Sequence, residues 1–140
     1  MTQEQIVSVQ ESWKNVAKVD PLIIGEIFYD RLFQTAPYLR PLFKNTLAEQ
    51  SRKLIATINY VIIKLDKLNE IVDEVSNLAK RHVQYGVKAE HYAVVGETLL
   101  WTLKTGLGES WNVELEKAWT LCYNTLAGAM IEASEESVAA

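Results

Sequence analysis

The sequence predicts an all-α fold. Apolar side chains recur at steps of three and four residues along most of the chain, which is the spacing of one face of a helix. Of the 140 residues, 49% are hydrophobic, but only 6 are glycine and 3 are proline, too few for the many turns of a β fold. A chain of this length is the usual size of one domain with one core.

The first two predicted helices begin at identifiable caps. Thr2, with Gln5 three residues later, forms a capping box, and Asp20 followed by Pro21 supplies an N-cap and a first-turn proline. Each helix carries one apolar face, and Gly25 is expected where the second helix packs closely on a neighbour. The two faces consist of Ile6, Val9, Trp13 and Val16, and of Ile24, Ile27, Phe28 and Leu32.

The later helices are separated by short joints. Pro37 and Pro41 allow only a short turn-like helix that ends at Phe43, and residues 44–47 form a corner. Helical patterns then cover residues 48–65, 72–83 and 89–107, and a last one begins at Asn112. We expect residues 1–133 to form the folded domain and residues 134–140 a short mobile tail.

Composition and charge exclude several classes of function. The net charge is -4, with acidic and basic residues interleaved, so no positive surface is expected to attract nucleic acid. The N-terminus has no signal-peptide pattern and the apolar runs are short, so no membrane partner is expected. The one cysteine, Cys122, fits a reducing compartment, and the expected location is the cytoplasm.

His82 is the most informative single residue. It follows Val72, Val75, Leu78 and Ala79 on the apolar face of its helix, so the imidazole is expected to point inward. The only other histidine is His91, and no acidic residue lies at a metal-ligand spacing from His82, which disfavours a metal site made of protein groups alone. Two interpretations remain: a hydrogen-bonded core histidine, or the axial ligand of a large apolar cofactor.

Two further polar side chains lie on apolar faces. Tyr29 follows Phe28 on the second helix, and Gln50 lies one turn before Leu54 on the long helix. A buried phenol or carboxamide without a partner costs about 1–3 kcal/mol, so each must find a hydrogen bond. The partner is either a bound polar ligand or a group of the protein itself, and Phe43 is either core or a cofactor contact.

Taken together and in order, these segments resemble a globin. The order is Tyr29, Pro37, Leu42–Phe43, Gln50 with Leu54, His82 with Tyr85–Gly86–Val87, and His91–Tyr92. The chain is similar to bacterial single-domain haemoglobins and to the haem domains of flavohaemoglobins, from Thr2 to about Glu132. The resemblance implies a three-over-three helical sandwich, a globin domain over residues 1–133, and one haem b, iron protoporphyrin IX, as cofactor.

The resemblance also implies residue roles. His82 would be the proximal iron ligand, Phe43 would stack on the porphyrin, and Tyr29 and Gln50 would donate hydrogen bonds to a bound gas, with Leu54 keeping that pocket dry. Further cofactor contacts would be Leu78, Val87, Tyr92 and Val95. Lys53 and Arg81 are candidates for pairing with the haem propionates.

The chain departs from flavohaemoglobins on the proximal side. Those proteins hold the proximal histidine in a network with a tyrosine and a glutamate; Tyr92 matches the tyrosine, whereas the glutamate position aligns with Ser134. Glu132 or Glu135 is the alternative occupant if the register of the last helix shifts. The sequence contains no glycine-rich dinucleotide fingerprint, so a separate reductase is the expected electron source for any redox cycle.

Several functions remain open on this fold. The first is reversible binding of dioxygen, with nitric oxide and carbon monoxide as further gas ligands, for oxygen transport or storage. The second is nitric oxide dioxygenation with an external electron donor, so whether the protein is an enzyme stays open, and the third is haem-based gas sensing. A haem-free globin-like module and a bilin attached to Cys122 are further alternatives.

Overall fold

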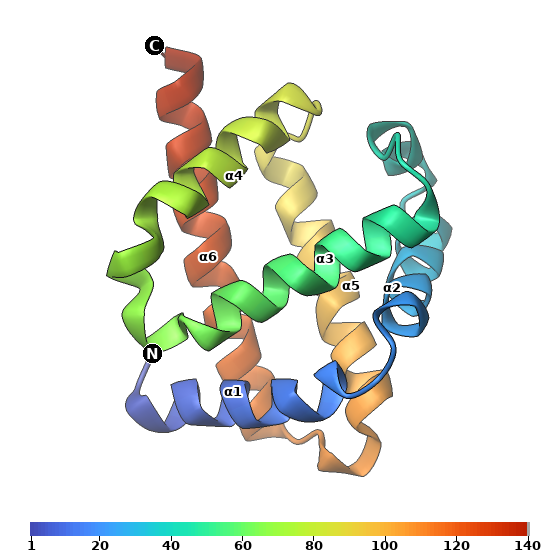
Figure 1. The fold of residues 1–140 in the computed structure, drawn as a ribbon, viewed down its shortest axis with the longest axis vertical. Helices are drawn as coiled ribbons and strands as arrows, with labels where there is room; N and C mark the ends of the chain where they lie inside the picture. Colours follow the sequence, from blue (N-terminus) through green and yellow to red (C-terminus); the bar gives the residue numbers. More distant parts are fainter. Residues whose placement is uncertain (140) are drawn as a thin grey trace.

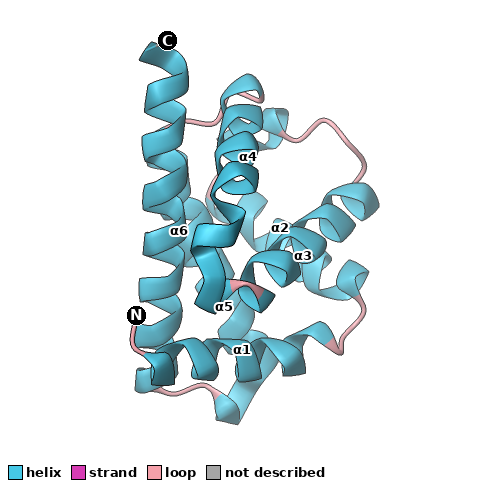
Figure 2. Cartoon of the chain, turned by 60° about the vertical axis from the view of Figure 1, so that its left-hand side comes forward, coloured by secondary structure: helices cyan, strands magenta, loops and turns pink. Residues whose placement is uncertain are grey.

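The computed structural model describes residues 1–139, and the side chains of residues 1–135. The helices are α1 (Gln3–Ala17), α2 (Pro21–Thr35), α3 (Leu47–Ile63), α4 (Val72–Gln84), α5 (Ala89–Leu107) and α6 (Val113–Ala139), with 3-10 turns η1 (Pro37–Leu42), η2 (Leu65–Ile71) and η3 (Gly108–Ser110). The described residues contain no strand (Figure 2). The predicted all-α class is therefore confirmed.

The six α-helices form two layers (Figure 1). In the view of Figure 1, α1, α3 and α4 lie in front of α2, α5 and α6. Between the two layers, α3 packs on α2, α4 packs on α6, and α1 packs on α6 and α5. The most extensive contact is between α2 and α3. Among the described residues, no helix is both long enough and apolar enough to cross a bilayer.

The helix starts follow the predicted capping chemistry. The Gln5 amide donates to Thr2 Oγ1 at 3.1 Å, and the Thr2 amide donates to Gln5 Oε1 at 2.9 Å. The Leu22 amide donates to Asp20 Oδ1 at 2.9 Å, which caps α2. α3 begins at Leu47, where the Thr46 hydroxyl accepts the Glu49 amide at 3.2 Å. Side-chain oxygens thus satisfy backbone donors that have no partner inside the helix.

The core consists of two clusters of buried side chains. The larger cluster joins α1, α2, α3, η2, α5 and α6 around Trp13 and Trp119. Trp119 Nε1 donates to Ser12 Oγ at 2.9 Å and Trp13 Nε1 donates to Asn59 Oδ1 at 3.1 Å, so both buried indoles have partners. The smaller cluster lies between α2 and η1 and contains Phe28, Tyr29, Leu32, Ala36 and Leu39. Leu54 packs against both clusters and links them.

Gly25 allows α2 to cross close to α3. A Cβ atom added at Gly25 would lie 2.7 Å from Ser51 Cα and closer still to the Ser51 side chain. The close contact predicted at this glycine is therefore present, and the neighbouring residue is Ser51. Ser51 is buried, and its hydroxyl has no hydrogen-bond partner among the described residues. This crossing places Tyr29 on α2 beside Gln50 on α3.

The structure differs from the sequence expectation at the end of the last helix and at one joint. Residues 134–139 continue α6 as helix to Ala139, where the sequence analysis placed a tail, because alanine and glutamate there are good helix formers. The mobility of this segment stays a prediction. The joint between the helical patterns over residues 48–65 and 72–83 is a 3-10 turn, η2, whose ends Leu65 and Ile71 are both buried. Burial of these two side chains holds the joint against the core.

Cys122 lies on α6, and its side chain is buried in the larger core cluster. Burial raises the pKa of its thiol to about 12, so the reactive thiolate is rare at neutral pH. We therefore expect no reaction of the folded protein with a thiol reagent at pH 8, and one equivalent of reaction in denaturant. Rapid labelling of the folded protein would contradict this burial and would favour the bilin alternative.

Candidate functional site

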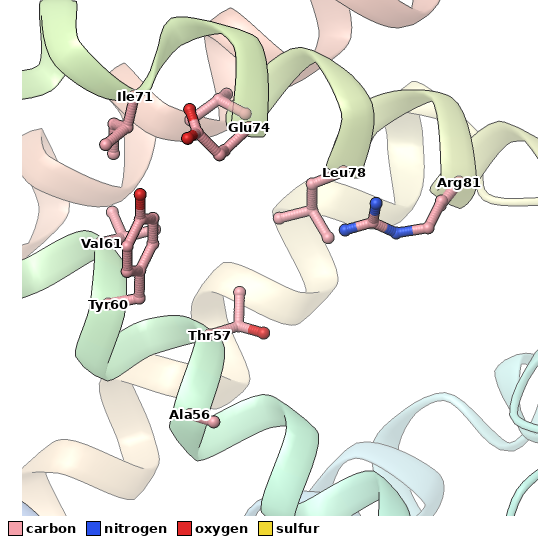
Figure 3. Close-up of a pocket in the computed structure, with 9 residues that line it drawn as sticks. Ala56, Thr57, Tyr60, Val61, Ile71, Glu74, Leu78 and Arg81 are labelled. Carbon is pink, nitrogen blue, oxygen red and sulfur yellow. The ribbon is translucent and has the colours of Figure 1, made fainter.

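A cavity of about 300 Å³ lies between α3 and α4 (Figure 3). Five of its nine lining residues have apolar side chains. The lining residues are Ala56, Thr57, Tyr60 and Val61 of α3, Ile71 at the end of η2, and Glu74, Val75, Leu78 and Arg81 of α4. A volume of this size is at the lower end of the range of small-molecule and cofactor pockets.

His82 lies on α4, next to the cavity residue Arg81 and one turn after Leu78. Its Nδ1 atom is 2.7 Å from the Leu78 carbonyl oxygen. Because a carbonyl can only accept, Nδ1 must carry the proton, and the neutral ring presents a lone pair at Nε2. Burial of His82 lowers the pKa of its imidazole, and the nearby positive charge of Arg81 lowers that pKa further. The hydrogen bond to the Leu78 carbonyl raises the pKa, but by less than burial lowers it. The ring is thus held neutral, in the tautomer that metal ligation requires.

The backbone after His82 is fixed by a Schellman motif. The Val87 amide donates to the His82 carbonyl at 2.9 Å, and the Gly86 amide donates to the Val83 carbonyl at 3.0 Å. Gly86 has a φ of +89°, the left-handed conformation that side chains disfavour, and a Cβ there would lie 3.3 Å from Leu42 Cδ2. The end of α4 is therefore anchored directly at the predicted metal ligand.

The predicted gas-contact residues lie together at the corner between α2, η1 and α3. Tyr29, Phe43 and Gln50 line one small cavity of about 40 Å³. The Tyr29 ring is 3% exposed and contacts the Phe43 ring edge-on, with centroids 5.4 Å apart. The other lining residues are Phe33, Arg40, Asn45 and Leu47.

The Tyr29 hydroxyl donates to the backbone carbonyl of Gln50 at 3.5 Å. This distance is at the limit of a hydrogen bond, so the bond is weak. In this structure the partner of Tyr29 is therefore a group of the protein itself, the backbone carbonyl of Gln50. Burial raises the pKa of Tyr29 to about 12, so the phenol stays a donor at all physiological pH values.

The structure brings the predicted residues together in two groups. His82 and Tyr92 form one, with their rings stacked at 6.4 Å and 26°, and Tyr29, Phe43 and Gln50 form the other. Of the predicted cofactor contacts, Leu78 lines the larger cavity, whereas Leu54 and Val95 pack against the smaller core cluster and Val87 follows the α4 terminus. His82 itself is not among the residues that line the larger cavity.

Sequence reasoning missed several residues of the larger cavity. Thr57 and Val61 lie three and seven residues after Leu54, so they continue the helix face that Leu54 begins. Extending that face by two turns would have found both. Glu74 had no signal, because an exposed glutamate near a helix start is ordinarily a solvated residue.

The tyrosine–glutamate network that the resemblance implies around His82 is not formed among the described residues. The Tyr92 hydroxyl is buried without a hydrogen-bond partner in the part of the chain that the structure describes. The Ser134 hydroxyl donates to the Ile131 carbonyl of its own helix at 2.7 Å. Glu132 and Glu135 are both exposed. Neither glutamate that the sequence offered as a substitute is therefore buried beside the imidazole, whose Nδ1 donates to a backbone carbonyl.

Tyr123, which the sequence analysis did not select, fixes the backbone at Tyr92. Its hydroxyl donates to the Tyr92 carbonyl at 2.6 Å, and its ring contacts the position where Gly96 lacks a Cβ. A larger residue at Gly96 would meet the ring at 2.6 Å from Cε2. The signal that could have found this contact is a glycine inside a helix.

Loss of the hydroxyl group is expected to change the free energy of unfolding in opposite directions at Tyr92 and at Tyr123. Tyr92→Phe removes a buried oxygen without a partner and should leave the free energy of unfolding unchanged or raise it by about 1 kcal/mol. Tyr123→Phe removes a satisfied bond and should lower it by about 1 kcal/mol. Urea unfolding of the apoprotein measures both. A marked loss of stability in Tyr92→Phe would show that its hydroxyl has a partner.

Comparison with known proteins identifies the family. The globin family profile matches residues 26–130, three quarters of the chain, so this protein belongs to the globin family. The chain is 31% identical over 144 residues to neuroglobin-1 of Oncorhynchus mykiss, covering 93% of this chain and 90% of that protein. It is 35% identical over 107 residues to the flavohemoprotein of Bacillus subtilis, covering 74% of this chain and only 27% of that protein.

A solved structure gives the same relationship. The bacterial globin from Campylobacter jejuni superposes with a TM-score of 0.87 at 26% identity, covering 99% of this chain and 100% of that one. The globin resemblance and the globin fold are thus confirmed. As a globin, the protein takes haem as its cofactor, and its function is haem-based binding of a gas.

The residues of this chain fit a haem. The cavity between α3 and α4 is lined mainly by apolar side chains, as a macrocycle requires, and Arg81 at its edge supplies a positive charge. His82 is held in the tautomer with a free lone pair at Nε2. Tyr29 and the amide of Gln50 supply hydrogen-bond donors at the corner of α2 and α3.

Proposed function

We propose that this protein binds dioxygen reversibly at the ferrous iron of a haem b whose protein ligand is His82. The observation that carries the proposal is the 2.7 Å contact between His82 Nδ1 and the Leu78 carbonyl, since it orients the ring and leaves Nε2 for the metal. A core histidine could make the same bond, but the neighbouring cavity and membership in the globin family favour the ligand role.

Bound haem b would supply an iron with one open position for a diatomic gas: dioxygen, nitric oxide or carbon monoxide. Tyr29 would donate a hydrogen bond to that gas, because its present bond to the Gln50 carbonyl is long and is given up at little cost. The Gln50 amide, which lines the same small cavity, would be the second donor. Phe43 and Leu54 would keep water out, and Leu78, Val87, Tyr92 and Val95 would complete the cofactor contacts.

Removing the Tyr29 hydroxyl tests the role of this residue. Tyr29→Phe is expected to speed dioxygen release roughly tenfold or more, because a hydrogen bond to a partly charged acceptor contributes about 1.5–3 kcal/mol. Stopped-flow measurement of release from the ferrous protein gives the rate. Tyr38→Phe is the matched control, because Tyr38 is 64% exposed on η1 and should leave the rate unchanged. Equal rates of dioxygen release in the two variants would contradict a contact between Tyr29 and the bound gas.

Nitric oxide dioxygenation with a separate reductase is the second candidate function. Support comes from the similarity to the flavohemoprotein, of which this chain spans about a quarter. Sustained nitrate formation by catalytic amounts of protein with a reductase would favour the enzyme. Slow re-reduction under the same conditions would favour reversible binding for transport or storage, or gas sensing. The buried lone Cys122 fits a reducing compartment, and the cytoplasm is the proposed location.

A further inference from the structure

The polar side chains that line the small cavity beside Tyr29 are all hydrogen-bond donors. Tyr29, Arg40, Asn45 and Gln50 carry N–H or O–H groups, and none of the seven lining residues is acidic. The chain as a whole has a net charge of -4, so this cavity differs from the average of the molecule. A space surrounded by donors and one guanidinium, without a carboxylate, is complementary to an anion.

These donors are not engaged strongly within the part of the chain that the structure describes. The ion pairs and hydrogen bonds among those residues do not include the side chains of Arg40, Asn45 or Gln50. The Tyr29 hydroxyl makes only its long bond of 3.5 Å to the Gln50 carbonyl. All four side chains can therefore turn toward a ligand in the cavity without breaking a strong bond.

The cavity leads from solvent to the buried Tyr29 ring. Arg40 and Asn45 are exposed and Leu47 is 42% exposed, whereas Tyr29 is 3% exposed. The Arg40 guanidinium carbon lies 4.9 Å from the centre of the Phe33 ring, and the Phe33 ring stacks on the Tyr29 ring with centroids 5.8 Å apart. This cation–π contact holds the positive charge of Arg40 at the mouth of the cavity.

From this arrangement we propose that the small cavity admits small monovalent anions to the gas-binding side of the haem, and that Arg40 at its mouth attracts them. The inference rests on the proposed function, which places Tyr29 and Gln50 beside the bound gas. A volume of about 40 Å³ accommodates an ion of a few atoms and no larger organic anion. Nitrate, the product of the second candidate function, belongs to this class.

The test compares an anionic with a neutral ligand of the haem iron. Azide is an anion at neutral pH and carbon monoxide is neutral. Stopped-flow association of azide with the ferric holoprotein, and of carbon monoxide with the ferrous holoprotein, therefore separates the effect of charge from that of access. Arg40→Gln is expected to slow azide association about twofold to fivefold at low ionic strength, the effect of one exposed charge, and to leave carbon monoxide association unchanged.

A charge series at the same position sharpens the test. Arg40→Lys should keep most of the azide rate, because the ammonium keeps the positive charge. Arg40→Glu should slow azide more than Arg40→Gln does, because it places a negative charge at the mouth. Arg52→Gln is the matched control: it removes an exposed positive charge from α3, outside the cavity lining, and should change neither rate.

Three results would overturn the proposal. The first is equal slowing of azide and carbon monoxide by Arg40→Gln, which would show a packing effect. The second is an azide rate that is the same in wild type, Arg40→Gln and Arg40→Glu, and the third is equal slowing of azide by Arg52→Gln and Arg40→Gln. A protein that binds dioxygen reversibly but gives one of these results contradicts this inference alone. If the wild-type protein takes up no haem, the proposed function fails and this inference fails with it.

Discussion

Replacing His82 with alanine is expected to abolish stable haem binding. The imidazole would be the iron's only bond to the protein, and its orientation is set by the 2.7 Å contact with the Leu78 carbonyl. Groups that only orient a metal ligand contribute about 10–100-fold to affinity, so loss of the ligand itself should weaken haemin binding by more than about 100-fold. Titration of the apoprotein with haemin, followed by absorbance, measures the change.

His91→Ala is the matched control for His82→Ala. His91 is the other histidine of the chain, and its Nδ1 accepts the Lys88 amide at 3.0 Å at the start of α5. Its removal should cost about 1 kcal/mol of stability as the loss of a helix cap, and haemin binding should remain. Full haemin binding by His82→Ala, or equal loss in both variants, would contradict the assignment of His82 as the ligand.

The second large effect is expected at Gly25. Gly25→Ala would place a Cβ 2.7 Å from Ser51 Cα, in backbone contact that cannot be relieved by turning a side chain. We expect the free energy of unfolding to fall by at least about 2 kcal/mol, and dioxygen release to change as well, because this crossing positions Tyr29 beside Gln50. Urea unfolding of the purified variants measures the stability.

Gly128→Ala is the control for Gly25→Ala. Gly128 also lies inside a helix, α6, but a Cβ there would meet nothing within 4 Å. Alanine should therefore raise stability by about 0.5–1 kcal/mol, the ordinary helix preference over glycine. Adding Ser51→Gly to Gly25→Ala should recover part of the loss. Stabilisation by Gly25→Ala alone would show that α2 and α3 are not as close as described.

The fold was predictable because local signals agreed with one another. The Thr2 and Asp20 caps, the apolar faces and the turn after Tyr85 each have a local cause, and each lies where the sequence indicated. Gly25 was correctly placed at a close contact, but its neighbour Ser51 comes from another helix, which periodicity alone does not identify. The helical extent of residues 134–139 was not expected from the sequence, because no apolar face marks this segment, and the mobility of the tail stays a prediction.

The candidate site was predictable only in part. The inward direction of His82 follows from helix spacing, but its acceptor, the Leu78 carbonyl, is a backbone atom that any residue would supply. The acceptor for Tyr29 is likewise the backbone of Gln50, and not the side chain that the pattern drew attention to. The place of Glu74 and Arg81 in the lining of the cavity between α3 and α4 could not be predicted from the sequence, because the shape of the cavity depends on how the two helices pack.

Absorption spectra of the ferrous, haem-loaded protein through one cycle of oxygen addition and removal test the central claim most directly. The account predicts a change of spectrum on adding dioxygen and full return to the ferrous spectrum when the gas is removed. A ferrous spectrum that does not respond to dioxygen, or that converts at once to the ferric form with no return, would contradict reversible binding. Preparations that remain colourless after haemin is supplied would contradict the haem site itself.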